Sequence, residues 1–506
     1  MAYLFLAVAL ALVLLTVFWQ RSLGRPICPP GPRKHWLYGN LFDMPYSVNW
    51  QRLLDWNEQF GDMVYLTAFG HSVIVLNTPK AIKDLLVKRA RNYSNRPHTV
   101  MAYELFDMKK SMVLADYDDK YRELRKLTQQ AFGPEASKKY EGVQLDIIRR
   151  FLQGLQKDPQ GFRTHTRLLV SRFILAVTYG LDAETADSEF IAGAELTLQV
   201  LTKATLPGAY LVDLLPSLRY LPTWFPFASF HDVGARGRKL VYDHRSRPFE
   251  YVRQQMADGV ASPSFVSDLL SDSYMSKFQS VDAAQWAEYI KWAAGDMFGA
   301  GVETSFSTTL IFFLAMALHP GAQAKAQAEI DLVTGGHKLV TLSDRPNMPY
   351  FKALLQEVAR WQVVVPTGVF RRSDNDDVYN GYHIPANTIV LPSIWALSQS
   401  VEDPGRFNPE RFLDDSNSPN PYEYIYGFGK RICPGRYLAD NFIFLVTANI
   451  LAFFNVSQPS GPLDDGLKLP SNVSFTPTMV SCPEPFACNI RPRTSEHAEE
   501  IAAMIA

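Results

Sequence analysis

The sequence predicts a mainly α protein with minor β-structure, in one large helical domain with small sheets, preceded by an N-terminal transmembrane helix. Three observations favour this fold class: an uncharged apolar start, helical spacing of apolar residues over about 100–330, and short β-prone runs near 63–76 and 365–395. The 506 residues are 47% hydrophobic and 20% charged, which is enough for a large core. Neither internal repeats nor low-complexity tracts divide the chain, so we expect a single domain despite its length.

Residues 1–20 predict a membrane anchor. Ala2 to Trp19 is apolar, with one Thr and no charge, and as a helix it would span ~27 Å, close to the thickness of a bilayer core. A cleaved signal peptide is the alternative, but its apolar run is shorter, follows basic residues and ends at a small-residue cleavage site. Here the basic residues follow the run, at Arg21, Arg25, Arg33 and Lys34. This order predicts a cytoplasmic location for the rest of the chain.

Residues 21–34 predict a proline-rich hinge, and 35–506 the main domain. Four prolines between Pro26 and Pro32 exclude a helix there. The runs 63–69 and 72–76 predict a hairpin, and Pro79 opens a helix. Longer helices are predicted around 145–155, 168–179, 282–318 and 435–454, and the Pro- and aromatic-rich stretch 206–230 interrupts the helical pattern.

Charge and cysteine content exclude two classes of protein. The net charge of −1, from 50 basic and 51 acidic residues, provides no cationic field for nucleic acid, so no nucleic-acid partner is expected. Four cysteines are too few and too scattered for a disulfide framework. Each cysteine is therefore judged by its surroundings.

The segment from Tyr426 to Arg436 carries the strongest chemical signal. Its cysteine, Cys433, lies among three glycines and three basic residues, just before an apolar helix. Glycines let the backbone turn tightly and approach a flat partner. The basic side chains and the helix N-terminus both favour the thiolate, which is the metal-binding form of cysteine. The alternative, a buried structural cysteine, fits these spacings less well.

This segment resembles the heme-binding signature of the cytochrome P450 family. Tyr426 stands where Phe is usual, and the other positions match. The resemblance implies heme b as cofactor and Cys433 as the axial iron ligand, whose sulfur favours O–O cleavage. It also implies contacts with the cofactor from the segment itself, at Tyr426, Gly429, Arg431 and Gly435.

An acid and an alcohol lie side by side in the apolar helix at 282–318. Glu303 and Thr304 would be buried there, and a buried carboxylate needs a purpose or a partner. The segment resembles the family's oxygen-activation motif, which implies that both are catalytic proton carriers and that Ala300 and Gly301 leave room for dioxygen. The resemblance also implies a substrate pocket, formed by Met297, Phe298, Ala300, Gly301, Val365 and Val369. These residues are apolar, so a lipophilic small molecule is the expected substrate.

Glu357 and Arg360 share one helical face, but Glu250 and Arg253 have the same spacing. Only the first pair precedes a β-rich stretch and a Pro-Glu-Arg-Phe segment, the order found in the family. By resemblance, Arg411 completes a buried structural network with Glu357 and Arg360, and the other pair is exposed. The loop at 397–404 is shorter than the family usually has, which puts heme retention in question.

Three residues outside the cysteine segment are predicted to bind the heme carboxylates, which favour arginine partners. By resemblance these are Arg125, Tyr121 in place of the usual Trp, and Arg371. The alternative for each is an ordinary surface position.

Neither a P-loop nor a Rossmann fingerprint is evident, so electrons must come from a partner. The resemblance implies NADPH–cytochrome P450 reductase in the same membrane, here that of the endoplasmic reticulum, with the domain facing the cytoplasm. Candidate docking residues are Arg122, Lys126, Lys430 and Arg436. The expected activity is monooxygenation of a lipophilic molecule in secondary-metabolite biosynthesis, because two segments resemble fungal members. The alternative is a membrane-tethered heme protein without turnover: a ligand binder, an isomerase or an inactive paralogue.

Overall fold

The computed structural model describes residues 27–44, 50–184, 188–206, 209–271, 282–413, 418–459 and 467–504. The predicted anchor at 1–20 and the first part of the hinge, to residue 26, lie outside the described residues. Within the described ranges, one helix, Ala283–Leu318, is apolar and long enough to cross a membrane. However, 72% of its most apolar window is buried inside the protein, as expected of a core helix.

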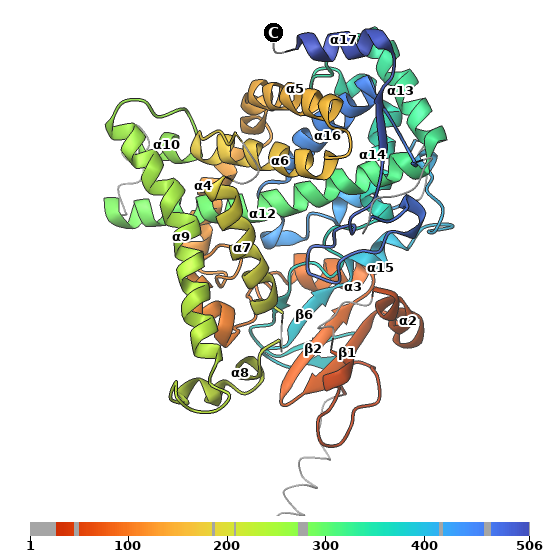
Figure 1. Ribbon diagram of the computed structural model, residues 1–506. Coiled ribbons are helices and arrows are strands. Elements are labelled where there is room, and N and C mark those ends of the chain that lie inside the picture. Colours follow the sequence, from red (N-terminus) through yellow and green to blue (C-terminus); the bar gives the residue numbers. More distant parts are fainter. Residues whose placement is uncertain are drawn as a thin grey trace, which may run out of the picture.

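This helix, α12 (Ala283–Leu318), runs through the centre of the molecule and organises the other helices around it (Figure 1). It packs against α6 (Phe162–Tyr179), α9 (Phe230–Ala257) and α16 (Arg436–Phe453). Asp282 caps its start by accepting a hydrogen bond from the N–H of Gln285 at 2.8 Å. The remaining helices are α2 (Trp50–Phe60), α3 (Pro79–Ile82), α4 (Asp119–Phe132), α5 (Glu141–Lys157), α7 (Glu189–Ala204), α8 (Leu211–Leu214), α10 (Phe265–Leu270), α13 (Pro320–Thr334), α14 (Pro349–Trp361), α15 (Ile394–Ser398) and α17 (Ser495–Ala503).

A small sheet packs beside the helices. Strands β1 (Met63–Ala68) and β2 (His71–Leu76) form the predicted hairpin, with Met63 opposite Leu76. Strand β2 pairs in parallel with β6 (Ile389–Pro392), and β6 pairs antiparallel with β3 (Arg371–Arg372). Two further antiparallel pairs are β4 (Asp377–Tyr379) with β5 (Tyr382–Ile384), and β7 (Phe454–Ser457) with β8 (Asn489–Pro492).

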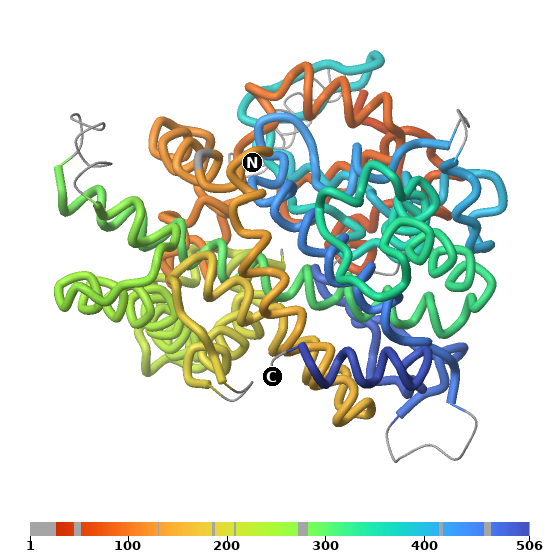
Figure 2. The backbone as a smooth tube through the Cα atoms, turned by 90° about the horizontal axis from the view of Figure 1, so that it is seen from above, coloured from red at the N-terminus to blue at the C-terminus, as the bar shows by residue number. Residues whose placement is uncertain are grey.

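Each predicted helix corresponds to an observed one, although α6 begins six residues before the predicted start at 168 and α5 four residues before that at 145. The prediction at 282–318 matches α12, that at 435–454 matches α16, and Pro79 is the first residue of α3. Within the described residues, the stretch 209–229 is irregular, as expected, apart from α8 and a 3-10 turn at Pro216–Tyr220. Figure 2 shows the C-terminal helix α17 lying along α5, which it contacts. The described part of the chain is thus mostly helical with small sheets, as predicted.

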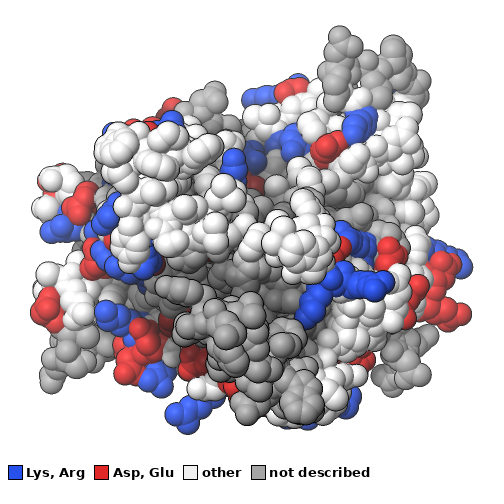
Figure 3. Space-filling model, turned by 90° about the horizontal axis from the view of Figure 1, so that it is seen from below, with Lys and Arg blue, Asp and Glu red and all other residues white. Residues whose placement is uncertain are grey.

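Large apolar side chains are exposed at the end of the molecule that carries the β1–β2 turn and α8. Trp36 and Phe227 are each 86% exposed, and Trp224 is 79% exposed. The Nε2 atom of His71 lies 3.3 Å from the carbonyl oxygen of Leu214, so the two segments adjoin. Figure 3 shows a broad uncharged area on this face. Apolar patches of this kind mark contact with a partner or a membrane.

Candidate functional site

The cysteine segment forms a tight turn that leads into α16. The N–H of Cys433 donates to the carbonyl oxygen of Tyr426 at 2.8 Å, which closes the turn. Gly427 and Gly429 have positive φ angles of 76° and 55°, and a Cβ on Gly429 would lie 2.4 Å from the carbonyl oxygen of Leu86. Only glycine fits at 429. A Cβ on Gly435 would instead meet no protein atom within 4 Å, so no described neighbour requires a glycine there.

Cys433 is partly buried in the protein. Burial raises its pKa, while the N–H of Gly435 and the charges of Arg125 and Arg436 act to lower it. The basic surroundings predicted from the sequence are therefore present, but desolvation outweighs them. In the protein alone the neutral thiol is favoured, and a further positive charge at the sulfur would stabilise the thiolate.

Three buried arginines gather beside the cysteine turn, at positions 96, 371 and 431. Arg431 donates to the carbonyl oxygens of Ser94, Met112 and Ala115, at 2.6–3.1 Å. Arg96 donates to those of Val113, Val369 and Phe370. Arg371 donates to Phe428 at 2.6 Å, but its Nη1 is buried without a hydrogen-bond partner.

These arginines repel one another in a poorly solvated place. Burial lowers the pKa of Arg96 well below its usual value, and the charges of Arg431 and Arg371 lower it further. Burial, followed by Arg431, lowers the pKa of Arg371 to about 10. Within the described ranges no carboxylate forms an ion pair with any of the three. Clustered buried cations with an orphaned N–H form a site suited to an anion.

Helix α4 holds two of the predicted cofactor residues against the cysteine turn. The Tyr121 hydroxyl donates to the carbonyl oxygen of Lys430 at 3.0 Å, and the Tyr121 ring stacks 3.9 Å from the Arg431 guanidinium. Arg125 lies one helical turn further along and is near enough to act on Cys433. The structure thus brings Tyr121, Arg125, Arg371, Arg431 and Cys433 together. Arg96 was not predicted, because nothing in its local sequence connects it with the others.

The acid and the alcohol of α12 point to different sides. Thr304 donates its hydroxyl to the carbonyl oxygen of Ala300 at 2.9 Å, on the helix's more open face. Glu303 forms an ion pair with Arg167 of α6, and Arg167 also pairs with Glu195 of α7 at 3.0 Å. Sequence analysis missed Arg167 and Glu195.

Glu303 and Glu195 line a common cavity between α6, α7 and α12. Its other lining residues are Ser171, Ile191, Ala194, Leu198, Phe298, Gly299 and Val302. Apart from these two carboxylates and one serine, the lining is apolar, so the carboxylates are the groups there that can carry a proton.

The predicted substrate residues divide between two faces of α12. Phe298 is buried, with Tyr179 edge-on to its ring at 6.2 Å and His244 stacked on it at 5.3 Å. At Gly301 a Cβ would lie 2.9 Å from Cδ1 of Ile174, so the missing side chain lets α6 approach closely. Met297 and Ala300 share the face of Thr304, because they are spaced by three and four residues. Val365 and Val369 lie in the partly buried turn after α14, where the N–H of Gly368 donates to Val365.

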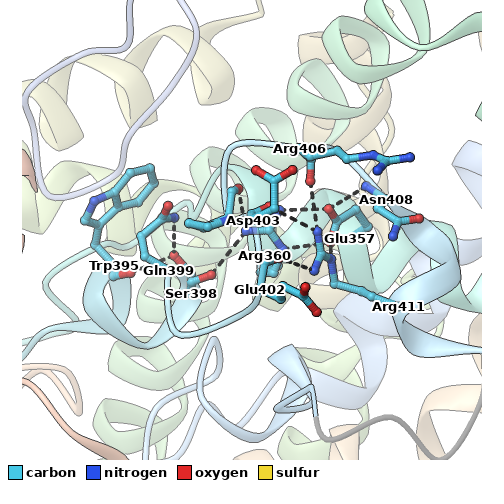
Figure 4. Close-up of polar contacts among 11 residues, drawn as sticks. Glu357, Arg360, Trp395, Ser398, Gln399, Glu402, Asp403, Arg406, Asn408 and Arg411 are labelled. Atoms are coloured by element: carbon cyan, nitrogen blue, oxygen red, sulfur yellow. Dashed lines mark hydrogen bonds and ion pairs between the residues drawn. The ribbon is translucent and has the colours of Figure 1, made fainter.

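A buried charge network lies behind the cysteine turn (Figure 4). Glu357 and Arg360 are both fully buried and joined by two hydrogen bonds of 2.7 and 2.8 Å. Arg411 forms an ion pair with Glu357 at 3.3 Å, and the N–H of Asn408 donates to the same carboxylate at 2.8 Å. The three predicted residues therefore meet in space. Glu250 and Arg253, the pair with the same spacing, are each 56% exposed, as predicted.

The short loop at 397–404 is tied directly to this network. Arg360 donates to the carbonyl oxygens of Ser398 and Pro404, at 3.2 and 3.1 Å. Arg411 donates to those of Glu402, Asp403 and Arg406. The loop thus supplies acceptors for two buried guanidinium groups, which gives its length a structural role.

Comparison with known proteins shows the family. The cytochrome P450 family model matches residues 29–479. The chain is 35% identical to the cytochrome P450 monooxygenase COX2 of Coprinopsis cinerea, over 98% of this chain and 96% of that protein. It is also 35% identical to the cytochrome P450 monooxygenase ple1 of Rhodocybe pseudopiperita, over 94% and 91%, and 34% identical to claR of Ampulloclitocybe clavipes, over 98% and 92%. The cysteine turn, the buried charge network and these matches together place the chain in the cytochrome P450 family.

Proposed function

We propose that this protein is a heme-thiolate monooxygenase that oxidises a lipophilic small molecule with O2. The observation that carries the proposal is the pairing of a partly buried cysteine with buried arginines that form no ion pair with a described carboxylate. A cofactor that supplies both a metal cation and carboxylates would provide a cation for the cysteine sulfur and anions for the arginines. The cytochrome P450 family implies heme with a thiolate-bound iron.

The residues present fit such a group. Cys433 would bind the iron, whose charge would offset the burial that raises the thiol pKa. Arg371, with its unpaired Nη1, would bind a heme carboxylate together with Arg96, Arg125, Arg431 and Tyr121. Tyr426, Gly429 and Gly435 would lie against the ring, and the open space beside Gly435 suits that role. When bound, the thiolate-ligated iron supplies the activation of dioxygen.

Glu303 and Thr304 would move protons on different sides of α12. Arg167 holds the Glu303 carboxylate at the cavity that Glu195 shares, so Glu303 can exchange protons with groups or water in that space. The Thr304 hydroxyl, bonded to Ala300, can turn to donate to a ligand on the Ala300 face. Because Glu303 and Thr304 are adjacent along α12, this pair would let a proton pass from one side of the helix to the other.

The substrate pocket would be formed chiefly by the face of Met297 and Ala300 with Val365 and Val369. All four are apolar, which favours a lipophilic substrate. Phe298 and Gly301 would shape this pocket indirectly, by setting how closely α6 approaches. We place the substrate in secondary metabolism because the chain resembles fungal family members, of which the compared relatives are examples.

The exposed aromatic face supports a location at the endoplasmic reticulum membrane. Trp36, Trp224 and Phe227 project from one end of the molecule, and the described chain begins on the same side with the exposed Ile27. Together with a single anchor at 1–20, this face would rest on the bilayer and leave the domain in the cytoplasm.

Electrons would come from NADPH through cytochrome P450 reductase. Arg122, Lys126 and Lys430 are exposed and lie on adjoining segments, because Tyr121 of α4 is bonded to the Lys430 carbonyl. They would form a cationic docking area for the reductase. Arg436 is partly buried and acts on Cys433, so it is a weaker docking candidate.

The first test is the carbon monoxide difference spectrum of reduced microsomes that contain this protein, beside a Cys433→Ser variant. We expect a red-shifted, thiolate-type Soret band that the variant lacks. Wild type without this band, although heme is bound, would refute the assignment of Cys433. Substrate-dependent NADPH consumption with added reductase then separates a monooxygenase from a heme protein without turnover, which would show the band and no such consumption.

A further inference from the structure

Two histidines and a glutamate meet at the C-terminal end of the domain, on the opposite side from the aromatic face. They are His337, just after α13, and His497 and Glu500, both on α17. One ligand atom from each lies within 4.8 Å of the other two. None of them belongs to the cysteine turn or the charge network. We propose that these three residues bind a divalent transition-metal ion of the zinc type, which clamps α17 to the end of α13.

The local backbone brings the ligands together. Helix α13 ends at Gly335, and both Gly335 and Gly336 have positive φ angles, of 77° and 86°. This double left-handed turn carries His337 back over α17, where its ring stacks on that of His497 with centroids 5.7 Å apart. His497 and Glu500 are three residues apart and therefore share one face of α17.

Hydrogen bonds at both ring nitrogens hold the His497 side chain in place. Its Nδ1 lies 2.7 Å from Oγ1 of Thr494, the N-cap of α17. A hydrogen bond from Nδ1–H to this oxygen would fix the ring and leave Nε2 as the lone-pair donor, as in known histidine metal sites. In the metal-free protein Nε2 lies 3.0 Å from the carbonyl oxygen of Gly336, the residue before His337, so Nε2–H donates to this carbonyl and Nδ1 accepts from the Thr494 hydroxyl. Metal binding at Nε2 would displace this proton and reverse the hydrogen bond to Thr494.

Glu500 contributes the carboxylate. Its Oε1 lies 2.7 Å from Nδ1 of His337, while its Oε2 is buried and has no hydrogen-bond partner. A metal ion would occupy the position of the proton between His337 and Glu500 and would also engage the second oxygen. Glu496, with Oε1 4.0 Å from Nδ1 of His337, is within reach as a fourth ligand.

The ligand set selects the metal. Two imidazoles with a carboxylate suit Zn²⁺, Co²⁺ or Ni²⁺, whereas Ca²⁺ and Mg²⁺ prefer sites made of oxygen alone. Ligand atoms around tetrahedral zinc lie about 3.3 Å apart, given bonds of about 2.0–2.1 Å. The present spread of up to 4.8 Å would therefore close with a small shift, chiefly of the exposed His337 side chain. Metal binding would also displace protons from the ligands, so the affinity should depend on pH.

The test is calorimetric titration of the full-length, heme-loaded protein with Zn²⁺, after treatment with a chelator and purification through a tag without histidine. We expect one Zn²⁺ per chain, and no comparable binding of Mg²⁺. His337→Asn, His497→Asn and Glu500→Gln should each weaken binding about tenfold or more. The matched control is His165→Asn, since His165 pairs with Asp158 at 3.6 Å without a second histidine and should not matter.

Hydrogen exchange of α17 provides a readout that needs no variant. Zn²⁺ should slow exchange of Ser495–Ala503 in the wild type, while Mg²⁺ should not. The carbon monoxide spectrum of each variant shows whether the domain has folded. Absence of a stoichiometric Zn²⁺ site in the wild type, or equal affinity in wild type and a folded His337→Asn variant, would overturn the proposal.

Discussion

Replacing Glu357 with Gln isolates the contribution of the buried charge network. The carboxylate accepts two hydrogen bonds from Arg360, one from the N–H of Asn408 and an ion pair from Arg411. Gln keeps the shape but removes the charge, which leaves two guanidinium groups without an anion. Since Arg360 is fully buried, breaking such a pair costs about 3–5 kcal/mol. This is a large part of a typical folding free energy of about 5–15 kcal/mol.

The chain contains its own control for this experiment. Glu250 and Arg253 have the same spacing and a 3.0 Å contact, but both side chains are 56% exposed. We expect Glu250→Gln to cost less than about 1 kcal/mol, because solvent screens exposed pairs. Large proteins with cofactors often unfold irreversibly, so the measurement is the half-life of the carbon monoxide band at raised temperature. Equal half-lives for the Glu357 and Glu250 variants would refute the reasoning from burial.

Three further predictions concern the heme site and the region around α8. Arg371→Gln should speed the loss of heme to an excess of a heme-accepting apoprotein by about tenfold, since a charged hydrogen bond contributes about 1.5–3 kcal/mol; an unchanged rate would exclude Arg371 as a carboxylate ligand. Glu303→Gln should lower product formed per NADPH consumed by about tenfold or more while substrate binding, followed spectrally, stays the same; unchanged coupling would leave Glu303 only its structural pairing with Arg167. Burial raises the pKa of Asp213 to about 6, against the opposing N–H groups of Met101 and Val100. Because this folded value exceeds the unfolded one, the stability that Asp213 contributes is complete below about pH 4 and is lost as pH rises through about 6. Intrinsic-rate-corrected hydrogen exchange of 100–105 should thus quicken between about pH 4 and 6 in the wild type and not in Asp213→Asn.

Dense local motifs explain what the sequence could predict. The cysteine turn is a compact run of glycines and basic residues, and the hairpin at 63–76 alternates around Gly70, so both are recognised without tertiary information. The position of Glu357 before Arg411 in the sequence was enough to distinguish it from Glu250 as the network glutamate. In each case the decisive residues lie close together or in a fixed order along the chain.

Features that depend on distant contacts were not predictable in this way. Arg167 lies 136 residues before Glu303, and neither position signals the other. Helix α12 is apolar nearly all round, so its periodicity could not show that Phe298 and Gly301 face α6 while Ala300 does not. The sequence also suggested that basic neighbours would make Cys433 a thiolate, but the desolvation that opposes them arises only from packing.

The carbonyl groups that the loop near 400 presents to Arg360 and Arg411 constrain the length of this loop. Every residue from Glu402 to Pro404 offers one of these oxygens, as does Arg406. Removing a residue there would take an acceptor from a buried guanidinium group. Gln399, Ser400 and Val401 lie between the anchored positions, and none of them provides an oxygen that accepts a hydrogen bond from Arg360 or Arg411. Insertions should therefore be tolerated at 399–401, which is the natural point for grafting an epitope or a reporter loop without disturbing the heme domain.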